Sequence, residues 1–129
     1  PGHTLLDIGC GTGVLALAGA RLGMKVEGID TDRDAILASR KNATKNGLHA
    51  RFDTRSIAKV EESYSLVVAN LYAEVLVELS VHIIGRVGQT LVLAGILSER
   101  AHLVREAFSA LELISCREEG DWTCLEYCR

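Results

Sequence analysis

The sequence lacks the features that mark membrane-spanning, secreted and extended proteins. It contains no apolar run long enough to cross a bilayer and no signal-peptide layout at its start, so we expect a soluble chain without membrane contact. It also contains no internal repeat, low-complexity tract or linker. Its 129 residues, 48% of them hydrophobic, therefore fit one globular domain over 1–129 with a real core.

Cysteines in a C-x-x-C arrangement are absent as well. Cys10, Cys116, Cys124 and Cys128 are the four cysteines. Cys124 and Cys128 are too far apart along a predicted strand for a local disulfide. A domain of this size needs no disulfide to fold, so a reducing cytoplasm is the simplest location. The four histidines are scattered over different predicted elements, and no metal site is expected.

A strong charge of either sign is also missing. The formal net charge is −3, which gives no bulk attraction to nucleic acid. Arg40, Lys41 and Lys45 fit a solvated helix face rather than a nucleic-acid surface. No spacing matches a Ser-His-Asp or paired-carboxylate hydrolase. The sequence thus argues against direct nucleic-acid binding and against these hydrolytic mechanisms.

The most informative stretch that is present is a glycine-rich turn over residues 5–13, Leu-Leu-Asp-Ile-Gly-Cys-Gly-Thr-Gly. An apolar strand passes through three alternating glycines into a helix that begins near Val14. Glycine has no Cβ and accepts positive φ, so a ligand can approach this backbone closely. The helix N-terminus adds N–H groups and a partial positive charge. We expect a nucleotide-like ligand here, and a glycine turn without a ligand is the alternative.

The spacing of the glycines narrows the class of ligand. G-x-G-x-G is one residue tighter than the dinucleotide fingerprint G-x-G-x-x-G. Asp7 would repel a pyrophosphate and suits a cationic or amine-bearing ligand. The pattern D-x-G-x-G-x-G resembles the first motif of class I S-adenosylmethionine (SAM) methyltransferases, whose ligand has an ammonium and a sulfonium and no phosphate. The resemblance implies cofactor contacts from Asp7, Gly9, Cys10, Gly11 and Gly13.

The rest of the chain alternates expected strands and helices. Further strands are expected near 25–30, 50–54, 66–70, 90–94, 113–117 and 122–128, and helices near 13–22, 32–46, 73–85 and 98–111. The stretch 55–64 is too short for a full crossover helix and is expected to be a loop or a single turn. The last two strands form a hairpin. This order predicts an α/β fold with a Rossmann-like doubly wound sheet of seven strands, the last antiparallel.

Several side chains have expected positions in these elements. Asp32 and Ser98 are expected to cap helices. The strand at 66–70 is apolar on both faces, as a central parallel strand must be. The buried side of the first helix is expected to consist of Val14, Leu15, Leu17, Ala18 and Leu22.

Ligands of doubly wound sheets bind beyond the carboxyl ends of the central strands. Asp30 follows the second strand, where an acid can accept hydrogen bonds from both hydroxyls of a ribose. A solvated acid at the end of a strand is the alternative. Thr31 beside it is assigned to the same cofactor site. After the third strand, Asp53, Ser56 and Ile57 are expected to lie at the edge of the adenine.

Asn70 follows the apolar fourth strand and is the candidate for positioning a methyl acceptor. A lysine with a pKa of about 10.4 needs about 4.6 kcal/mol to lose its proton at pH 7. A carboxylate here would stabilise the ammonium, whereas a neutral amide with apolar neighbours eases deprotonation. We therefore assign Asn70 to cofactor binding and catalysis, with Tyr72 in the substrate pocket. An asparagine that merely ends a strand is the alternative.

Longer stretches resemble the ribosomal protein L11 methyltransferase family (PrmA) over nearly the whole chain. These stretches are Asn-Leu-Tyr-Ala-Glu at 70–74, Gly-Ile-Leu at 95–97, the helical segment 100–107 and Glu-Gly-Asp-Trp at 119–122. The resemblance implies SAM as cofactor, with contacts from Gly9, Asp30 and Asn70. It also implies methylation of lysine side chains and an N-terminal amine of a large-subunit ribosomal protein.

The sequence departs from the family pattern at its start. Family members have an upstream substrate-recognition domain, and from the start at Pro1 we expect that domain to be absent from this chain. We therefore expect the ribosomal partner to be held through that domain. Methyl transfer to another amine or amide and a noncatalytic SAM-fold binding module remain alternatives, and the oligomeric state is open.

Overall fold

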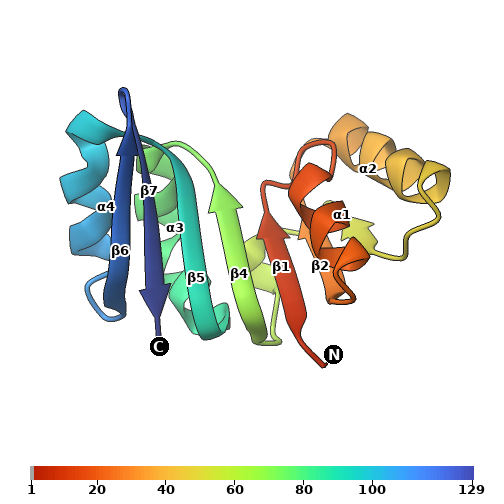
Figure 1. Cartoon of the computed structure of the whole chain (residues 1–129), viewed down its shortest axis with the longest axis horizontal. Coiled ribbons are helices and arrows are strands. Elements are labelled where there is room, and N and C mark those ends of the chain that lie inside the picture. Colours follow the sequence, from red (N-terminus) through yellow and green to blue (C-terminus); the bar gives the residue numbers. More distant parts are fainter. Residues whose placement is uncertain (1) are drawn as a thin grey trace.

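One seven-stranded sheet organises the computed structural model, which describes residues 2–129; Pro1, where the expected domain begins, lies outside them. The strands are β1 (Thr4–Ile8), β2 (Lys25–Ile29), β3 (Arg51–Asp53), β4 (Tyr64–Asn70), β5 (Val87–Leu97), β6 (Glu112–Glu119) and β7 (Trp122–Cys128). Their order in the sheet is β3-β2-β1-β4-β5-β7-β6. Strands β1 to β5 pair in parallel, and β7 is antiparallel to both β5 and β6 (Figure 1). The predicted α/β class is confirmed.

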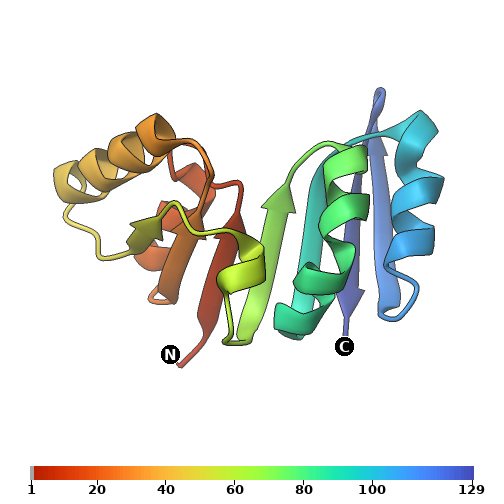
Figure 2. The same ribbon diagram turned by 180° about the vertical axis from the view of Figure 1, so that it is seen from behind.

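Helices lie on both faces of this sheet. They are α1 (Val14–Arg21), α2 (Arg33–Lys45), α3 (Ala73–Arg86) and α4 (Ala101–Ala107), with the single 3-10 turns η1 (Ile57–Lys59) and η2 (Ser98–Arg100). Helices α1 and α2 lie over the β1–β3 end of one face, and α3 and α4 cover the opposite face (Figures 1 and 2). The turn η1 confirms the single turn expected between 55 and 64. Among residues 2–129, no helix is long and apolar enough to cross a membrane.

The two expected helix caps have different outcomes. Asp32 caps α2, and its Oδ1 accepts a 2.9 Å hydrogen bond from the Asp34 amide. Ser98 does not cap a helix, because η2 begins there and α4 begins only at Ala101. The Ser98 hydroxyl instead lies 2.7 Å from the Thr123 hydroxyl on β7. The hydrogen-bond partner of Ser98 is thus on the strand β7, whereas the sequence predicted it in the helix that follows Ser98.

Helix α1 packs on the sheet through its small residues. The expected buried side was wrong for Val14, Leu15, Ala18 and Leu22, which are exposed, and right for Leu17. The buried residues of α1 are Ala16, Leu17 and Gly19. A Cβ at Gly19 would lie 2.5 Å from the Leu5 Cδ2 on β1, so the glycine permits a close approach of helix and strand. Helix-to-sheet distance, rather than side-chain size alone, therefore decides which side faces inward.

Strand β4 is central, but its two faces differ in burial. Val67 and Ala69, on the α3 face, have at most 1% of their surface exposed. Leu66 and Val68, on the α1 face, are half-buried and pack against the smaller core cluster formed under α1 and α2. The expectation of two apolar faces is confirmed, but only one of them is fully covered in the described chain.

Candidate cofactor site

The glycine turn after β1 uses its own backbone amides to hold its shape. The Gly9 and Cys10 amides both donate to the Ile29 carbonyl oxygen, at 2.8 and 3.0 Å. The Gly11 amide donates to Asp30 Oδ2 at 2.9 Å. A pyrophosphate is normally bound by unpaired backbone N–H groups at such a turn. Amides that are already paired favour a ligand without phosphate.

Gly9 also makes room for the wall of a cavity. Its φ is +73°, in the left-handed region that glycine tolerates. A Cβ at this position would lie 2.6 Å from Leu71 Cδ2, on the segment that follows β4. Gly9 therefore allows the turn and Leu71 to approach each other closely.

A cavity of about 220 Å³ opens at the carboxyl ends of β1 and β2. Five of the predicted cofactor residues line it: Gly9, Asp30, Thr31, Ser56 and Ile57. The other lining residues are Ile8, Ile29, Arg55, Leu71, Val75 and Leu79. The volume is below the roughly 300–1,000 Å³ of a pocket that encloses a whole drug-sized ligand. The cavity thus suits one part of a ligand, with the rest lying across the open strand ends.

The apolar wall of this cavity was missed in the sequence. Val75 and Leu79 are four residues apart on one face of α3, and Leu71, which precedes the helix, lines the same cavity four residues before Val75. This spacing was a usable signal. Helical spacing in the sequence singles out Leu76, Leu79 and Ile83, of which Leu79 belongs to this wall, whereas Leu76 and Ile83 lie on the adjacent face and are fully buried.

Asp30 is held in one orientation at the edge of the cavity. Its Oδ2 accepts from the Gly11 amide and its Oδ1 accepts from the Asp32 amide, both at 2.9 Å. Each carboxylate oxygen has a second lone pair. Asp30 can therefore accept two hydroxyl groups without giving up its backbone partners.

An ion-pair network fixes the loop that supplies Ser56 and Ile57. The Arg55 guanidinium pairs with Glu27 and lies 3.4 Å from Asp53 Oδ2. Asp53 Oδ1 also accepts from the Arg55 amide at 2.9 Å. The Asp53 carboxylate, expected at the adenine edge, is thus engaged by Arg55 and is not among the cavity-lining side chains.

Tyr64 extends this network into the core. Its hydroxyl donates to Glu27 Oε2 at 2.7 Å, and the Tyr64 side chain is buried. Burial, followed by the hydrogen bond to Glu27, raises the pKa of Tyr64 above its ordinary value. The tyrosine therefore stays protonated and serves as a donor to the carboxylate that holds Arg55.

Asp7 and Cys10 lie behind the turn rather than on the cavity surface. Asp7 is 2% exposed, and burial raises its pKa to about 6, with a further increase from the charge of Asp30. Burial also raises the pKa of Cys10 to about 11. Gly11 and Gly13, also predicted as cofactor residues, belong to the turn and do not line the cavity. A contact from any of these four to a bound cofactor stays a prediction.

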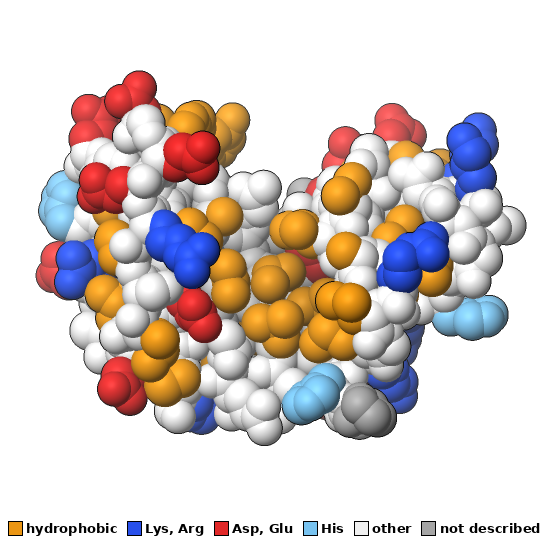
Figure 3. Space-filling view, viewed as in Figure 1, with side chains coloured by type: hydrophobic (Ala, Val, Ile, Leu, Met, Phe, Trp, Pro, Cys, Tyr) orange, Lys and Arg blue, Asp and Glu red, His pale blue; other side chains and the backbone are white. Residues whose placement is uncertain are grey.

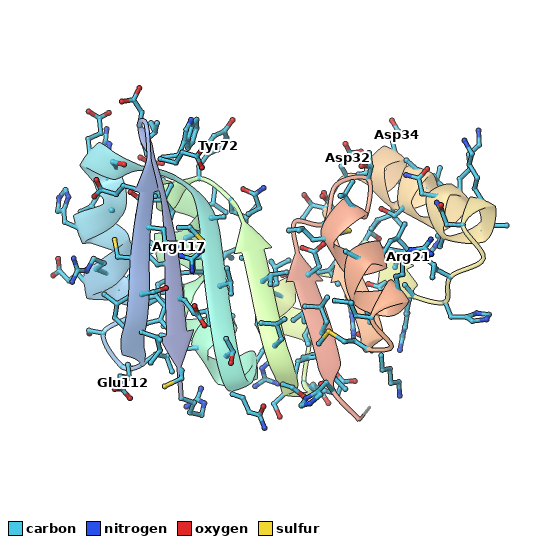
Figure 4. All side chains as sticks on the ribbon, viewed as in Figure 1. Arg21, Asp32, Asp34, Tyr72, Glu112 and Arg117 are labelled. Carbon is cyan, nitrogen blue, oxygen red and sulfur yellow. The ribbon has the colours of Figure 1, made fainter. Side chains whose placement is uncertain are left out.

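Asn70 and Tyr72 lie beyond the cavity, at the end of β4. A Cβ at Gly95 would lie 2.6 Å from Asn70 Oδ1, so the glycine on β5 leaves space for the amide. Tyr72 is 69% exposed and precedes α3 at the same end of the sheet (Figure 4). Neither residue lines the 220 Å³ cavity. A role for either residue in positioning a methyl acceptor stays a prediction.

A larger hollow and the cysteines do not add to this site. The hollow, about 560 Å³, lies between α2 and the β2–β3 edge and includes Lys25, the first residue of β2. It is therefore at the amino end of the strand, away from the ligand edge of such sheets.

The four cysteines are free thiols. In residues 2–129, no cluster of three or more His, Cys, Asp or Glu side chains is placed to hold a metal.

Comparisons with known proteins agree with this geometry. The family model of the ribosomal protein L11 methyltransferase (PrmA) matches residues 1–129. A protein of that name from Campylobacter concisus is 40% identical over 131 residues, covering 98% of this chain and 47% of the relative. One from Geobacter metallireducens is 39% identical, covering 95% and 43%. The chain thus spans less than half the length of these curated relatives.

Solved structures show the same architecture. A ribosomal protein L11 methylase from Lactobacillus delbrueckii subsp. bulgaricus superposes with a TM-score of 0.93 at 26% identity, covering 98% of this chain and 70% of that one. The magnesium protoporphyrin IX methyltransferase of Synechocystis PCC 6803, solved with bound SAM, has a TM-score of 0.84 at 19% identity, covering 100% and 71%, which shows the fold alone. Together with the match along the whole chain, these findings show that the chain belongs to the ribosomal protein L11 methyltransferase (PrmA) family.

Proposed function

We propose that this chain is the catalytic domain of a SAM-dependent protein N-methyltransferase that acts on a large-subunit ribosomal protein. One observation supports this most directly. The fixed carboxylate of Asp30 lies at the edge of an apolar cavity, at the carboxyl ends of two parallel strands. Such a site fits an adenosyl group, with the ribose on Asp30 and the base between Ile57 and Leu71.

The residues present fit SAM better than a dinucleotide. Leu71, Val75 and Ile57 offer an apolar slot for an adenine, and Asp30 offers two acceptors for its ribose. The paired amides of Gly9 and Cys10 leave little for a phosphate to bind. When bound, SAM would supply an electrophilic methyl group on its sulfonium.

The chain's contribution to the transfer is positioning. The acceptor nitrogen must present a free lone pair, because its new N–C bond would form as the sulfonium S–C bond breaks and S-adenosylhomocysteine leaves; the methylated nitrogen would then lose a proton to solvent. Asn70 can accept a hydrogen bond from the amine without the negative charge that would stabilise its ammonium form. Tyr72 would form the exposed side of the acceptor site. Holding the two reactants in line accounts for much of the rate enhancement of such a transfer.

The substrate assignment rests on the family. The relatives that match this chain are named for methylation of ribosomal protein L11, and the chain corresponds to less than half of each. The rest of a longer protein would supply contacts to the ribosomal substrate. A ribosomal substrate and four free cysteines both favour a cytoplasmic location.

Two measurements test the proposal. Calorimetry with S-adenosylhomocysteine should show saturable binding. An absence of heat would contradict the enzyme and favour the alternative, a noncatalytic module. The product of the complete gene, incubated with methyl-labelled SAM and a ribosomal extract, should label one small ribosomal protein. Label confined to RNA would overturn the assignment of a protein substrate.

A further inference from the structure

Strand β6 forms an open edge of the sheet. It is the last strand in the order β3-β2-β1-β4-β5-β7-β6, so among residues 2–129 only β7 pairs with it. An unpaired edge presents backbone N–H and C=O groups that can pair with another chain. The strand is eight residues long, and its Ile114 is 52% exposed. The edge is therefore long enough and accessible enough to accept a further strand.

The other edge of the sheet is protected. Strand β3 has only three residues, and Arg40 of α2 donates to the Phe52 carbonyl oxygen through Nε at 3.3 Å and Nη2 at 2.7 Å. Short edge strands and charged side chains that cover them are common defences against strand addition. If a strand is added to this sheet, β6 is the edge that favours it.

A bulge near the start of β6 places two opposite charges on the same face. Glu112 pairs with Cys128 and Arg117 pairs with Cys124, and the register shifts between these two pairs. The two cysteines are four residues apart on β7, so they share a face, and their partners on β6 share it too. In a regular strand, residues five positions apart would lie on opposite faces. Figure 4 labels Glu112 and Arg117 along β6. In the same view, Figure 3 shows both acidic and basic side chains over β6 and β7.

The same bulge places two apolar or thiol side chains on the opposite face. Leu113 pairs with Tyr127 and Cys116 pairs with Leu125. Tyr127 and Leu125 both belong to the core under α3 and α4. Leu113 and Cys116 therefore share the face that carries these helices, although they are three residues apart. The faces of β6 thus read the same from both sides of the bulge.

This symmetry makes the edge complementary to itself. Residues directly opposite each other in an antiparallel pair share a face. When two copies of β6 run antiparallel with their bulges opposed, Glu112 lies opposite the partner's Arg117, and Leu113 lies opposite the partner's Cys116. A shift by one residue opposes side chains of different faces. A shift by two toward the β6–β7 turn opposes Glu112 and the partner's Glu119, which are like charges. Face and charge therefore select the same register.

We propose that β6 is the docking surface for a second copy of this chain, which adds its own β6 in this antiparallel register. Two-fold symmetry makes each contact twice, so the interface contains two ion pairs between Glu112 and Arg117 and no like-charge pair over residues 112–117. Ile114, exposed in one chain, lies beside the axis and is covered by the second copy. The cofactor cavity is at β1 and β2, on the far side of β4 and β5, and stays open. The inference is independent of the proposed enzymatic activity.

Exchange of the two charges tests the register. Glu112→Arg and Arg117→Glu each replace two attractive pairs by two repulsive ones, and each should weaken self-association by about tenfold or more. The double variant restores both pairs with their signs exchanged, so it should associate as well as the parent does. Sedimentation over a concentration series measures this for the 129-residue chain and for the product of the complete gene. Added salt should weaken the parent dimer and strengthen the dimer of each single variant.

Glu119→Arg is the matched control. It makes the same charge change as Glu112→Arg on an exposed residue of β6, but outside the paired segment, and it should leave self-association unchanged. An equal loss for these two variants would overturn the proposal, as would a double variant that associates no better than the single ones. A parent chain that is monomeric at every concentration would overturn it as well. So would a dimer that forms from the 129-residue chain but not from the complete product, since another segment then covers β6.

Discussion

The carboxylate of Asp30 accepts a hydrogen bond from the backbone amide of Gly11, with 2.9 Å between Oδ2 and N. This contact joins the end of β2 to the glycine turn after β1, nineteen residues earlier in the chain. It orients the acid before any ligand arrives, and a preorganised acceptor loses less freedom on binding than a mobile one.

Asp30→Ala should weaken binding of S-adenosylhomocysteine by roughly ten- to a hundredfold. A hydrogen bond to a charged group contributes about 1.5–3 kcal/mol, and the substitution also releases the Gly11 amide. Calorimetry measures the change. The control is Asp34→Ala in the first turn of α2, an exposed acid outside the cavity lining. Similar losses for the two variants would argue for a general effect of negative charge at this edge.

Gly9→Ala should reduce cofactor binding by closing the cavity. The added Cβ would meet Leu71 Cδ2 at 2.6 Å, and φ at this position is +73°. Gly23→Ala is the matched control, because Gly23 also has positive φ but has no atom within 4 Å of its Cβ position. Both variants should lose about 1–2 kcal/mol of stability from the left-handed backbone. Only Gly9→Ala should lose affinity, and the additional change Leu71→Ala should restore part of it.

The class and order of the fold were predictable because they follow from local patterns. Alternating apolar segments and glycine turns predict strands and helices directly, and Asp32 is a helix cap that depends only on its neighbours two residues away. Ser98 failed as a cap because its hydroxyl is hydrogen-bonded to Thr123, which is 25 residues distant on β7, and no local pattern reveals that this strand lies beside Ser98.

In the candidate site, too, some features follow from local patterns in the sequence and others depend on tertiary packing. Gly9, Asp30 and Ser56 were identifiable because ligands of these sheets lie at the strand ends. The burial of Asp7 and the inward side of α1 depend on how closely the helix approaches the sheet, which Gly19 sets through its contact with Leu5. Distances of this kind arise from tertiary packing and are not encoded in the periodicity of one helix.

Arg55→Met should weaken cofactor binding more than Arg51→Met. Both arginines lie near the carboxylates of Glu27 and Asp53, but Arg55 has 22% of its side chain exposed and Arg51 has 66%. Exposed ion pairs contribute little, whereas the Arg55 pairs hold the loop that carries Ser56. The expected loss for Arg55→Met is several-fold in affinity for S-adenosylhomocysteine. Equal losses would show that net positive charge, rather than the loop, supports binding.

Asn70→Asp should shift the pH dependence of methylation rather than abolish it. A carboxylate beside the acceptor amine stabilises its ammonium form and raises the pKa of that amine. The variant should therefore be slower by at least about tenfold at pH 7 and should recover part of its rate at higher pH. Steady-state rates of the complete gene product between pH 7 and 10 provide the measurement. A loss that is the same at every pH would indicate that Asn70 acts only in positioning.

Asp7 should make the stability of the fold depend on pH in the acidic range. Burial raises its pKa from 3.8 to about 6, so the folded state binds the proton more tightly than the unfolded state. The stabilisation from protonated Asp7 is complete below about pH 4 and is lost as the pH rises through 6, a change of roughly 3 kcal/mol. Asp7→Asn has a neutral side chain at every pH and lacks this loss. In urea unfolding, wild type should therefore lose about that much stability relative to Asp7→Asn between pH 4 and pH 7, whereas parallel profiles would show that Asp7 keeps an ordinary pKa in the fold.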